Sequence, residues 1–515
     1  MMPQDYERFF AGLMRAFYLA LLVIAVLAVS LVVSCTCRAA ERISPLQATF
    51  VALQDAAGLP VEVRPFVRYV YVPDGTAESR GAISFLANAA IYTSAQIQQA
   101  VAVSDHIVRL DFLEGGGDLK TWERLWPDPL FNVAFGGVVR KEITVAPYVA
   151  SDGKTYTRKV VEQRLIFPAH CLPHAQPLAD LLGTNVPIID ARFLVVRSLS
   201  TVDQGYGDGL YYDFVGIKRS VDKQRTDEEL FYDGFGIDLK RARKNLVVSR
   251  AAILNRNLNN KLAAVEIVQG EAHPATTDGK IYATFDLQDR DADVGRDPIE
   301  NLLGFIDGGQ HRASEVIAPR RNGLHLFALF DASGKLQFEV PPDVAVWSGV
   351  PSGHTNRLIP GMACIQCHST GKEMGLRTFT NDARDLPALF DFADKNSRER
   401  LRSEYGFDLA RPVAESRNYL ADATFLATNG MSVEATGAAV FALWADFLYN
   451  PVTARTALLD LGIETADEPA ARLRLAEIKT SNAYIQSLVI GKQIGRKQWS
   501  RVLPDVAAHT RKDYP

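Results

Sequence analysis

The spacing of hydrophobic residues divides the chain into a part with mixed periodicity and a part with helical periodicity. Alternation with a period of two predicts strands at residues 67–72, 105–113, 263–268, 281–285 and 324–330. The apolar stretch at residues 193–196 is predicted as a strand as well. Spacing of three and four residues predicts helices at residues 81–101, 438–449, 453–461 and 470–488. We therefore predict an α+β protein, with a mixed α/β region at residues 45–345 and a mainly helical region at residues 346–515.

The most apolar segment lies near the N-terminus. No charged residue occurs from Ala16 to Cys37, and this length suits a segment that inserts into a membrane. The sequence Val-Val-Ser-Cys that ends at Cys35 resembles a bacterial lipoprotein signal, in which the cysteine is lipidated. We interpret residues 1–40 as a cleaved signal peptide, as a lipoprotein leader with a lipid on Cys35, or as a retained membrane anchor. Each alternative places the rest of the chain outside the cytoplasmic membrane, so we expect a periplasmic, membrane-anchored protein of the cell envelope.

The overall charge and the cysteine count exclude two broad classes of protein. The chain has 56 Lys and Arg residues against 60 Asp and Glu residues, which gives a formal net charge of −4. Nucleic-acid binding driven by phosphate neutralisation is therefore not expected. Five cysteines in 515 residues are too few for a fold held together by disulfides. We predict a globular protein whose chemistry lies in a specific motif.

That motif is Cys364-Ile-Gln-Cys367-His368, a C-x-x-C-H sequence of the kind that attaches c-type haem. Two thiols three positions apart on a helix reach one edge of the porphyrin, and the histidine that follows reaches the iron. A four-ligand zinc site would need a second Cys/His pair, and a thioredoxin-like motif would follow a strand; neither context is visible. The motif predicts one haem c, covalently bound through Cys364 and Cys367, with His368 as the proximal ligand of its iron.

The second axial ligand of the iron is not fixed by the motif. Met362 and Met374 lie so close to the motif that each would need a sharp chain reversal to reach the other side of the ring. Met431 lies in a loop-like stretch farther along the chain, and we predict it as the distal ligand. His354, upstream of the motif, is the alternative.

Several stretches resemble a group of large, mostly uncharacterised, single-haem c-type cytochromes of planctomycete bacteria. The similar stretches are residues 68–72, 108–112, 121–125, 211–216, 322–327, 361–368, 457–462 and 496–499. Only the C-x-x-C-H motif is specific enough to carry residue roles over. The resemblance implies haem binding and electron transfer in the cell envelope, and it implies no particular substrate.

The leader, the motif and the resemblance together predict an exported monohaem c-type cytochrome that transfers one electron to or from a redox partner protein in the cell envelope. Residues 346–515 form the predicted helical haem c domain, and the region at residues 45–345 is of unknown role. The alternative is a peroxidase-like haem enzyme, or a gas or redox sensor, in which the sixth coordination position of the iron is open. The sequence favours an electron-transfer protein over an enzyme, and it predicts no catalytic residue.

Overall fold

A computed structural model gives the fold. It describes residues 43–125, 137–144, 148–149, 155–156, 159–166, 172–201, 209–221, 224–244, 248–255, 261–269, 280–287, 298–308, 311–340, 347, 350, 357–369, 394–408, 410–461, 463, 465–478, 482–496, 498–499, 501–503 and 506. The predicted leader at residues 1–40 lies outside these residues. The chain is a mixed α and β protein, consistent with the predicted α+β class.

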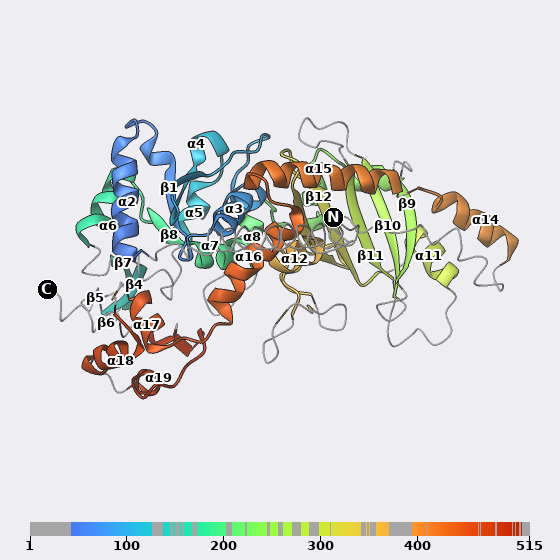
Figure 1. Cartoon of the computed structure of the whole chain (residues 1–515). Coiled ribbons are helices and arrows are strands. Elements are labelled where there is room, and N and C mark those ends of the chain that lie inside the picture. The colour runs from blue at the N-terminus through green and yellow to red at the C-terminus, as the bar shows by residue number, and fades with distance from the viewer. Residues whose placement is uncertain are drawn as a thin grey trace, which may run out of the picture.

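A four-stranded sheet forms one end of the molecule (Figure 1). Its strands are β2 (Val101–Ser104), β3 (Ile107–Asp111), β1 (Val67–Tyr71) and β8 (Ile188–Asp190), in that order. β1 pairs antiparallel with β3 and parallel with β8, and all five of its residues are buried. Helices α2 (Pro45–Gly58) and α6 (Leu172–Leu182) cover one face, while α3 (Ala77–Leu86), α7 (Ala191–Ser198) and α16 (Val433–Leu448) pack on the other. Burial on both faces explains why β1 has apolar or aromatic residues at nearly every position.

The strand predicted at residues 193–196 is wrong, because these residues belong to helix α7. Asp190 caps the helix: its side chain accepts hydrogen bonds from the backbone N–H groups of Arg192 and Phe193. All residues of α7 except Arg192 are buried, so the helix lacks the alternation of apolar and polar positions on which a sequence assignment depends. An N-terminal cap and burial from all sides therefore outweigh the β-branched residues.

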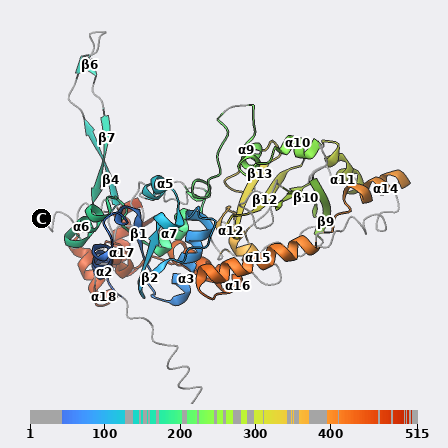
Figure 2. The same cartoon turned by 90° about the horizontal axis from the view of Figure 1, so that it is seen from above.

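A five-stranded antiparallel sheet forms the other end. Its strands are β13 (His325–Asp331), β12 (Ala313–Pro319), β11 (Lys280–Asp286), β10 (Lys261–Gln269) and β9 (Val248–Asn255), in that order. Helix α15 (Ala410–Thr428) crosses one face, and α9 (Asp227–Asp233), α10 (Leu239–Lys244) and α11 (Pro298–Ile306) lie on the other (Figure 2). The face under α15 carries the side chains of residues 325, 327 and 329 of β13, which point the same way because strand side chains alternate.

The two sheets share one hydrophobic core. A single cluster of buried side chains extends from Val70 in β1 to Phe447 in α16 and includes residues of every strand of the five-stranded sheet. The hairpin between β12 and β13 also joins the sheets: Arg320 donates hydrogen bonds to the backbone carbonyls of Ala89 and Tyr92, at the end of a short π-helix, η2 (Ala87–Ile91), that follows α3. This core therefore contains residues from both predicted regions, residues 45–345 and residues 346–515. The boundary predicted between the two regions stays a prediction.

From residue 357 onward, the described part of the chain forms helices and no named strand. These helices are α12 (Met362–Ser369), α14 (Lys395–Glu404), α15, α16, α17 (Ala454–Asp460), α18 (Glu468–Glu477) and α19 (Ala483–Val489). The last three have a separate small core. Within the described residues, no single helix has the length and apolarity of a membrane span; α15 and α16 pass that test only as a pair bent by 56°.

A two-stranded ribbon projects from the body near α6 (Figure 2). β4 (Gly137–Thr144) pairs antiparallel with β7 (Lys159–Ile166), and β5 (Tyr148–Val149) pairs with β6 (Thr155–Tyr156) farther out.

Candidate haem-attachment site

The C-x-x-C-H motif lies in α12, at the junction between the two sheets (Figure 1). The helix starts directly after Pro360-Gly361, where Gly361 has a φ of +93°. A Cβ atom at this position would come within 2.5 Å of the Leu199 carbonyl oxygen and 3.0 Å of the Tyr211 ring. Glycine therefore permits both the turn and the close approach. The first helical N–H, that of Met362, donates to the Leu199 carbonyl at 2.9 Å, which fixes the start of α12 against the chain after α7.

The helix brings the three motif side chains to one face. Cys367 and His368 lie three and four positions after Cys364, and such positions are neighbours on a helix surface. Cys364 is 2% exposed, whereas Cys367 and His368 are half-buried. Neither cysteine forms a disulfide with a described residue. The motif thus extends from the core at Cys364 to the surface at Cys367 and His368.

Two residues of the five-stranded sheet contact the motif. His368 Nε2 lies 3.4 Å from Glu315 Oε1 of β12. The His368 ring also stacks on Phe327 of β13, with ring centroids 5.4 Å apart and an interplanar angle of 25°. The same Glu315 carboxylate accepts a hydrogen bond from the Cys364 thiol. A carboxylate and an aromatic ring of the sheet therefore fix the orientation of the motif.

Burial and the negative charge of Glu315 raise the pKa of the Cys364 thiol well above its usual range. The thiolate is the nucleophilic form of cysteine, so the folded environment holds this side chain in its unreactive, protonated form. Oxidation and alkylation of Cys364 in the folded protein are correspondingly disfavoured.

Two tyrosines of the short helix α8 (Tyr211–Phe214) tie that helix to β13 and to the chain that follows it. The Tyr211 hydroxyl accepts a hydrogen bond from the backbone N–H of Phe327 at 3.0 Å, and the Tyr212 hydroxyl donates to the Gln337 carbonyl at 2.8 Å. Phe327 belongs to β13, which is an edge strand of the sheet in the described part of the chain. Tyr211 thus satisfies one edge donor that burial would otherwise leave without a partner, and it places Phe327 under His368.

Of the residues considered as distal ligands, Met431 and Met362 lie in the described part of the chain. Met431 precedes α16, and its Sδ atom lies within 2.5 Å of the position that a Cβ atom on Gly81 of α3 would occupy. The Met431 thioether therefore packs against α3, and its role as a ligand stays a prediction. Met362 is completely buried at the start of α12. His354 and Met374 lie outside the described residues.

His325, the first residue of β13, is not among the residues predicted from the sequence. Its side chain is 5% exposed and lies on the same face of the strand as Phe327. A histidine at an inward position of an alternating apolar stretch was the available signal, because buried strand positions are usually apolar. Glu315 of β12 is half-buried. A charged residue is ordinary at such a position, so its presence in the sequence gave no comparable signal.

The motif residues fit a c-type haem. The donor set consists of two thiols one helical turn apart and an imidazole on the same face, and these are the groups that the cofactor needs. Cys364 and Cys367 would hold the porphyrin edge and His368 would bind the iron, which supplies reversible one-electron chemistry. Among the described residues, no group of three or more His, Cys, Asp or Glu side chains is arranged to hold a bare metal ion.

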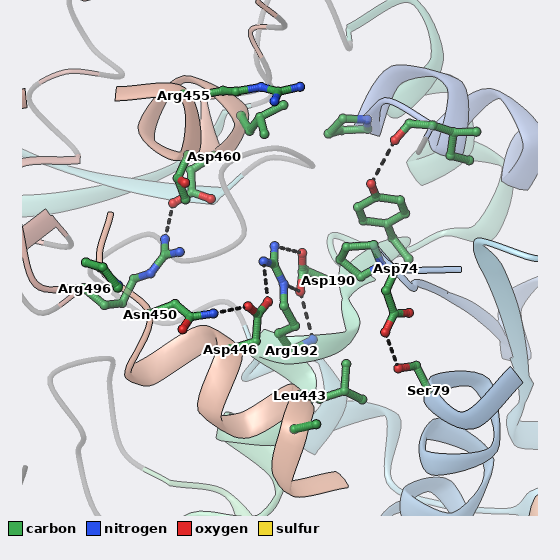
Figure 3. A pocket seen from close by; sticks show the side chains of 18 of the residues that line it. Asp74, Ser79, Asp190, Arg192, Leu443, Asp446, Asn450, Arg455, Asp460 and Arg496 are labelled. Carbon is green, nitrogen blue, oxygen red and sulfur yellow. Dashed lines mark hydrogen bonds and ion pairs between the residues drawn. The ribbon is translucent and has the colours of Figure 1, made fainter. Parts of the chain in front are cut away.

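A separate cavity of about 740 Å³ lies near the C-terminal end of α16 (Figure 3). Arg192 lies between Asp190 and Asp446, with N–O distances of 2.8 and 2.9 Å, and Arg496 pairs with Asp460. Burial alone lowers the Arg192 pKa, but the charges of Asp190 and Asp446 outweigh it and raise that pKa. Three carboxylates thus pair with two guanidinium groups at the junction with α17. The described residues that line the cavity include none from α12, so it is not part of the attachment site.

No family model matches the chain, and no curated protein or solved structure matches it either. The resemblance to planctomycete cytochromes therefore stays a prediction from the residues that carry it.

Proposed function

We propose that this protein is a monohaem c-type cytochrome that transfers one electron in the cell envelope, with residues 1–40 as its leader or membrane anchor. One observation carries the proposal: helix α12 presents Cys364, Cys367 and His368 on a single face. The haem-containing region would then be the helical part that includes α12, and the redox partner is a protein that the sequence does not name.

The exposure of the motif supports electron transfer with a protein partner. Cys367 and His368 are half-buried, so this end of α12 is at the surface of the described structure. His368 has 13% of its side chain exposed, and Glu315 beside it has 37%. Electron transfer between proteins requires close approach of the cofactor, and a motif that reaches the surface permits such an approach.

The burial of Cys364 constrains when the haem is attached. The thiol is 2% exposed and its pKa is raised, so it is neither accessible nor nucleophilic once the core has closed. Attachment by addition of the thiol S–H across a vinyl group therefore precedes complete folding of the region around α12. The proposal implies that the apoprotein, once folded, is a poor substrate for haem attachment.

Production of the full chain in a host that matures c-type cytochromes tests the proposal. The wild-type protein is expected to retain haem after denaturation in acid and detergent, with a mass increase of one haem. The double variant Cys364→Ser/Cys367→Ser is expected to lose haem under the same treatment. Cys171→Ser, which removes a cysteine outside the motif, is the matched control and is expected to retain it. A wild-type protein without covalent haem would contradict the proposal.

A further inference from the structure

The cavity at the C-terminal end of α16 has the size of a site for a small molecule (Figure 3). Its volume of about 740 Å³ lies within the range of about 300–1,000 Å³ that is usual for ligand pockets. Tyr71 of β1 and Asp74 line it together with Leu443 and Asp446 of α16 and with Asp460 of α17. Segments far apart in the sequence therefore form one concave surface.

The charges of the lining are nearly balanced. Four aspartates and three arginines line the cavity, and most of them pair with one another. Arg192 lies between Asp190 and Asp446, and Arg496 pairs with Asp460. A ligand with a net positive charge would meet the guanidinium groups, and one with a net negative charge would meet the carboxylates. Because like charges at close range are unfavourable, the lining favours an uncharged ligand.

Two buried polar atoms of the lining have no partner. Nε of Arg496 and the hydroxyl oxygen of Thr465 are buried and form no hydrogen bond with a described residue. Arg496 as a whole is 5% exposed. A buried polar atom without a partner costs free energy, because it has lost its hydrogen bond to water. A ligand in the cavity can supply the missing hydrogen bonds.

Other groups of the lining also have hydrogen-bonding capacity to spare. Arg455 of α17 is exposed, and its guanidinium forms no ion pair with a described residue. Asp460 accepts the hydrogen bonds of Arg496 and Trp499 on Oδ2, which leaves Oδ1 for a ligand. A guanidinium only donates hydrogen bonds and a carboxylate only accepts them, so the ligand needs groups that do both. Hydroxyl groups meet this requirement.

We propose that this cavity binds an uncharged, polyhydroxylated ligand of the saccharide class. Its hydroxyls donate to the carboxylates and accept from Arg496 and Arg455, while the C–H face of a sugar ring packs on Leu443 and Leu459. The site lies outside α12, so the proposal does not depend on the haem.

A glycan array probed with the full chain tests the chemical class of the ligand. The array carries neutral oligosaccharides of glucose, galactose, mannose and xylose, together with oligomers of galacturonic acid, which are anionic, and of glucosamine, which are cationic. At least one neutral oligosaccharide is expected to bind, and the charged oligomers are expected to bind at least about tenfold more weakly. Absence of binding to every neutral oligosaccharide, or tighter binding of a charged oligomer, would overturn the proposal.

Calorimetric titration of variants with the best neutral oligosaccharide tests the location. Thr465→Val removes a hydroxyl that has no partner in the described protein, so it is expected to weaken binding about tenfold without lowering the urea midpoint. Arg455→Ala, at an exposed position, is expected to weaken binding as well. Thr424→Val is the matched control, because it removes another buried hydroxyl without a partner, in α15 and away from the cavity, and it is expected to keep the wild-type affinity. Wild-type affinity in both cavity variants would place the binding elsewhere and overturn the proposal.

Discussion

Replacing Gly437 by alanine tests how closely α12 packs against α16. Gly437 is buried in α16, and a Cβ atom there would overlap both the hydroxyl and the Cβ atom of Ser369. Ser369 is the last residue of α12 and directly follows His368. The hydroxyl can rotate away, but the Ser369 Cβ atom moves only with the backbone of α12. The substitution therefore displaces the end of the helix that carries the proposed iron ligand.

The expected magnitude follows from two opposing contributions. Alanine in place of glycine within a helix stabilises the fold by about 0.5–1 kcal/mol, because it lowers the entropy of the unfolded chain. Extra atoms in a packed core cost about 1–3 kcal/mol. Because a backbone shift is needed, we expect the upper part of that range and a net loss of about 1–2 kcal/mol in the free energy of unfolding.

Urea unfolding of the apoprotein measures this difference, and α11 offers a matched control. Gly304 in that helix has no atom within 4 Å of the position where a Cβ would stand, so Gly304→Ala is expected to gain about 0.5–1 kcal/mol. Adding Ser369→Gly to Gly437→Ala removes the overlap, and the double variant is expected to be more stable than the sum of the single effects predicts. If Gly437→Ala proved as stabilising as Gly304→Ala, the contact between α12 and α16 would be refuted.

Further variants test buried titratable side chains by urea unfolding. Glu266→Gln is expected to lower the free energy of unfolding by about 3 kcal/mol, because it weakens the buried ion pairs that Glu266 forms with two arginines at 3.0 Å. Glu339→Gln, in a solvent-exposed ion pair, is the control and is expected to change that free energy little. Asp190→Ala is expected to cost about 2–4 kcal/mol, because it removes the cap of α7 and an ion pair to Arg192; an unchanged midpoint would exclude both roles. In the folded apoprotein the pKa of His325 is about 3, whereas in the unfolded chain His325 takes up a proton near pH 6.5. The free energy of unfolding is therefore expected to fall by up to about 1.4 kcal/mol per pH unit as the pH drops from 6.5 toward 3. His325→Gln should remove this part of the slope, and an unchanged slope would contradict the assigned pKa.

Several regular elements were predictable from a simple periodic pattern, but the helix predicted at residues 81–101 was too long: the helical stretch ends at Ile91, and Val101 begins strand β2. β11 and β13 lie at residues predicted as strands from alternation, and α16 and α17 lie at residues predicted as helices from spacing. Prediction failed at residues 193–196, because α7 is buried on nearly all sides and its apolar residues have no periodic pattern. Its cap, Asp190, was visible in the sequence but had no periodic helix after it to identify it as a cap.

The sequence by itself determined the part of the candidate site that depends on local geometry. In a helix, the spacing of Cys364, Cys367 and His368 puts the three side chains on one face whatever the rest of the fold is. The tertiary structure decided what that face contacts: Glu315 and Phe327 reach the motif from the five-stranded sheet, and His325 is placed beside them. The contacts of His368 with Phe327 and Glu315 join residues 41 and 53 positions apart, and they depend on how β12 and β13 pair and where α12 crosses the sheet. No local periodicity encodes such long-range packing, so only the folded chain reveals it.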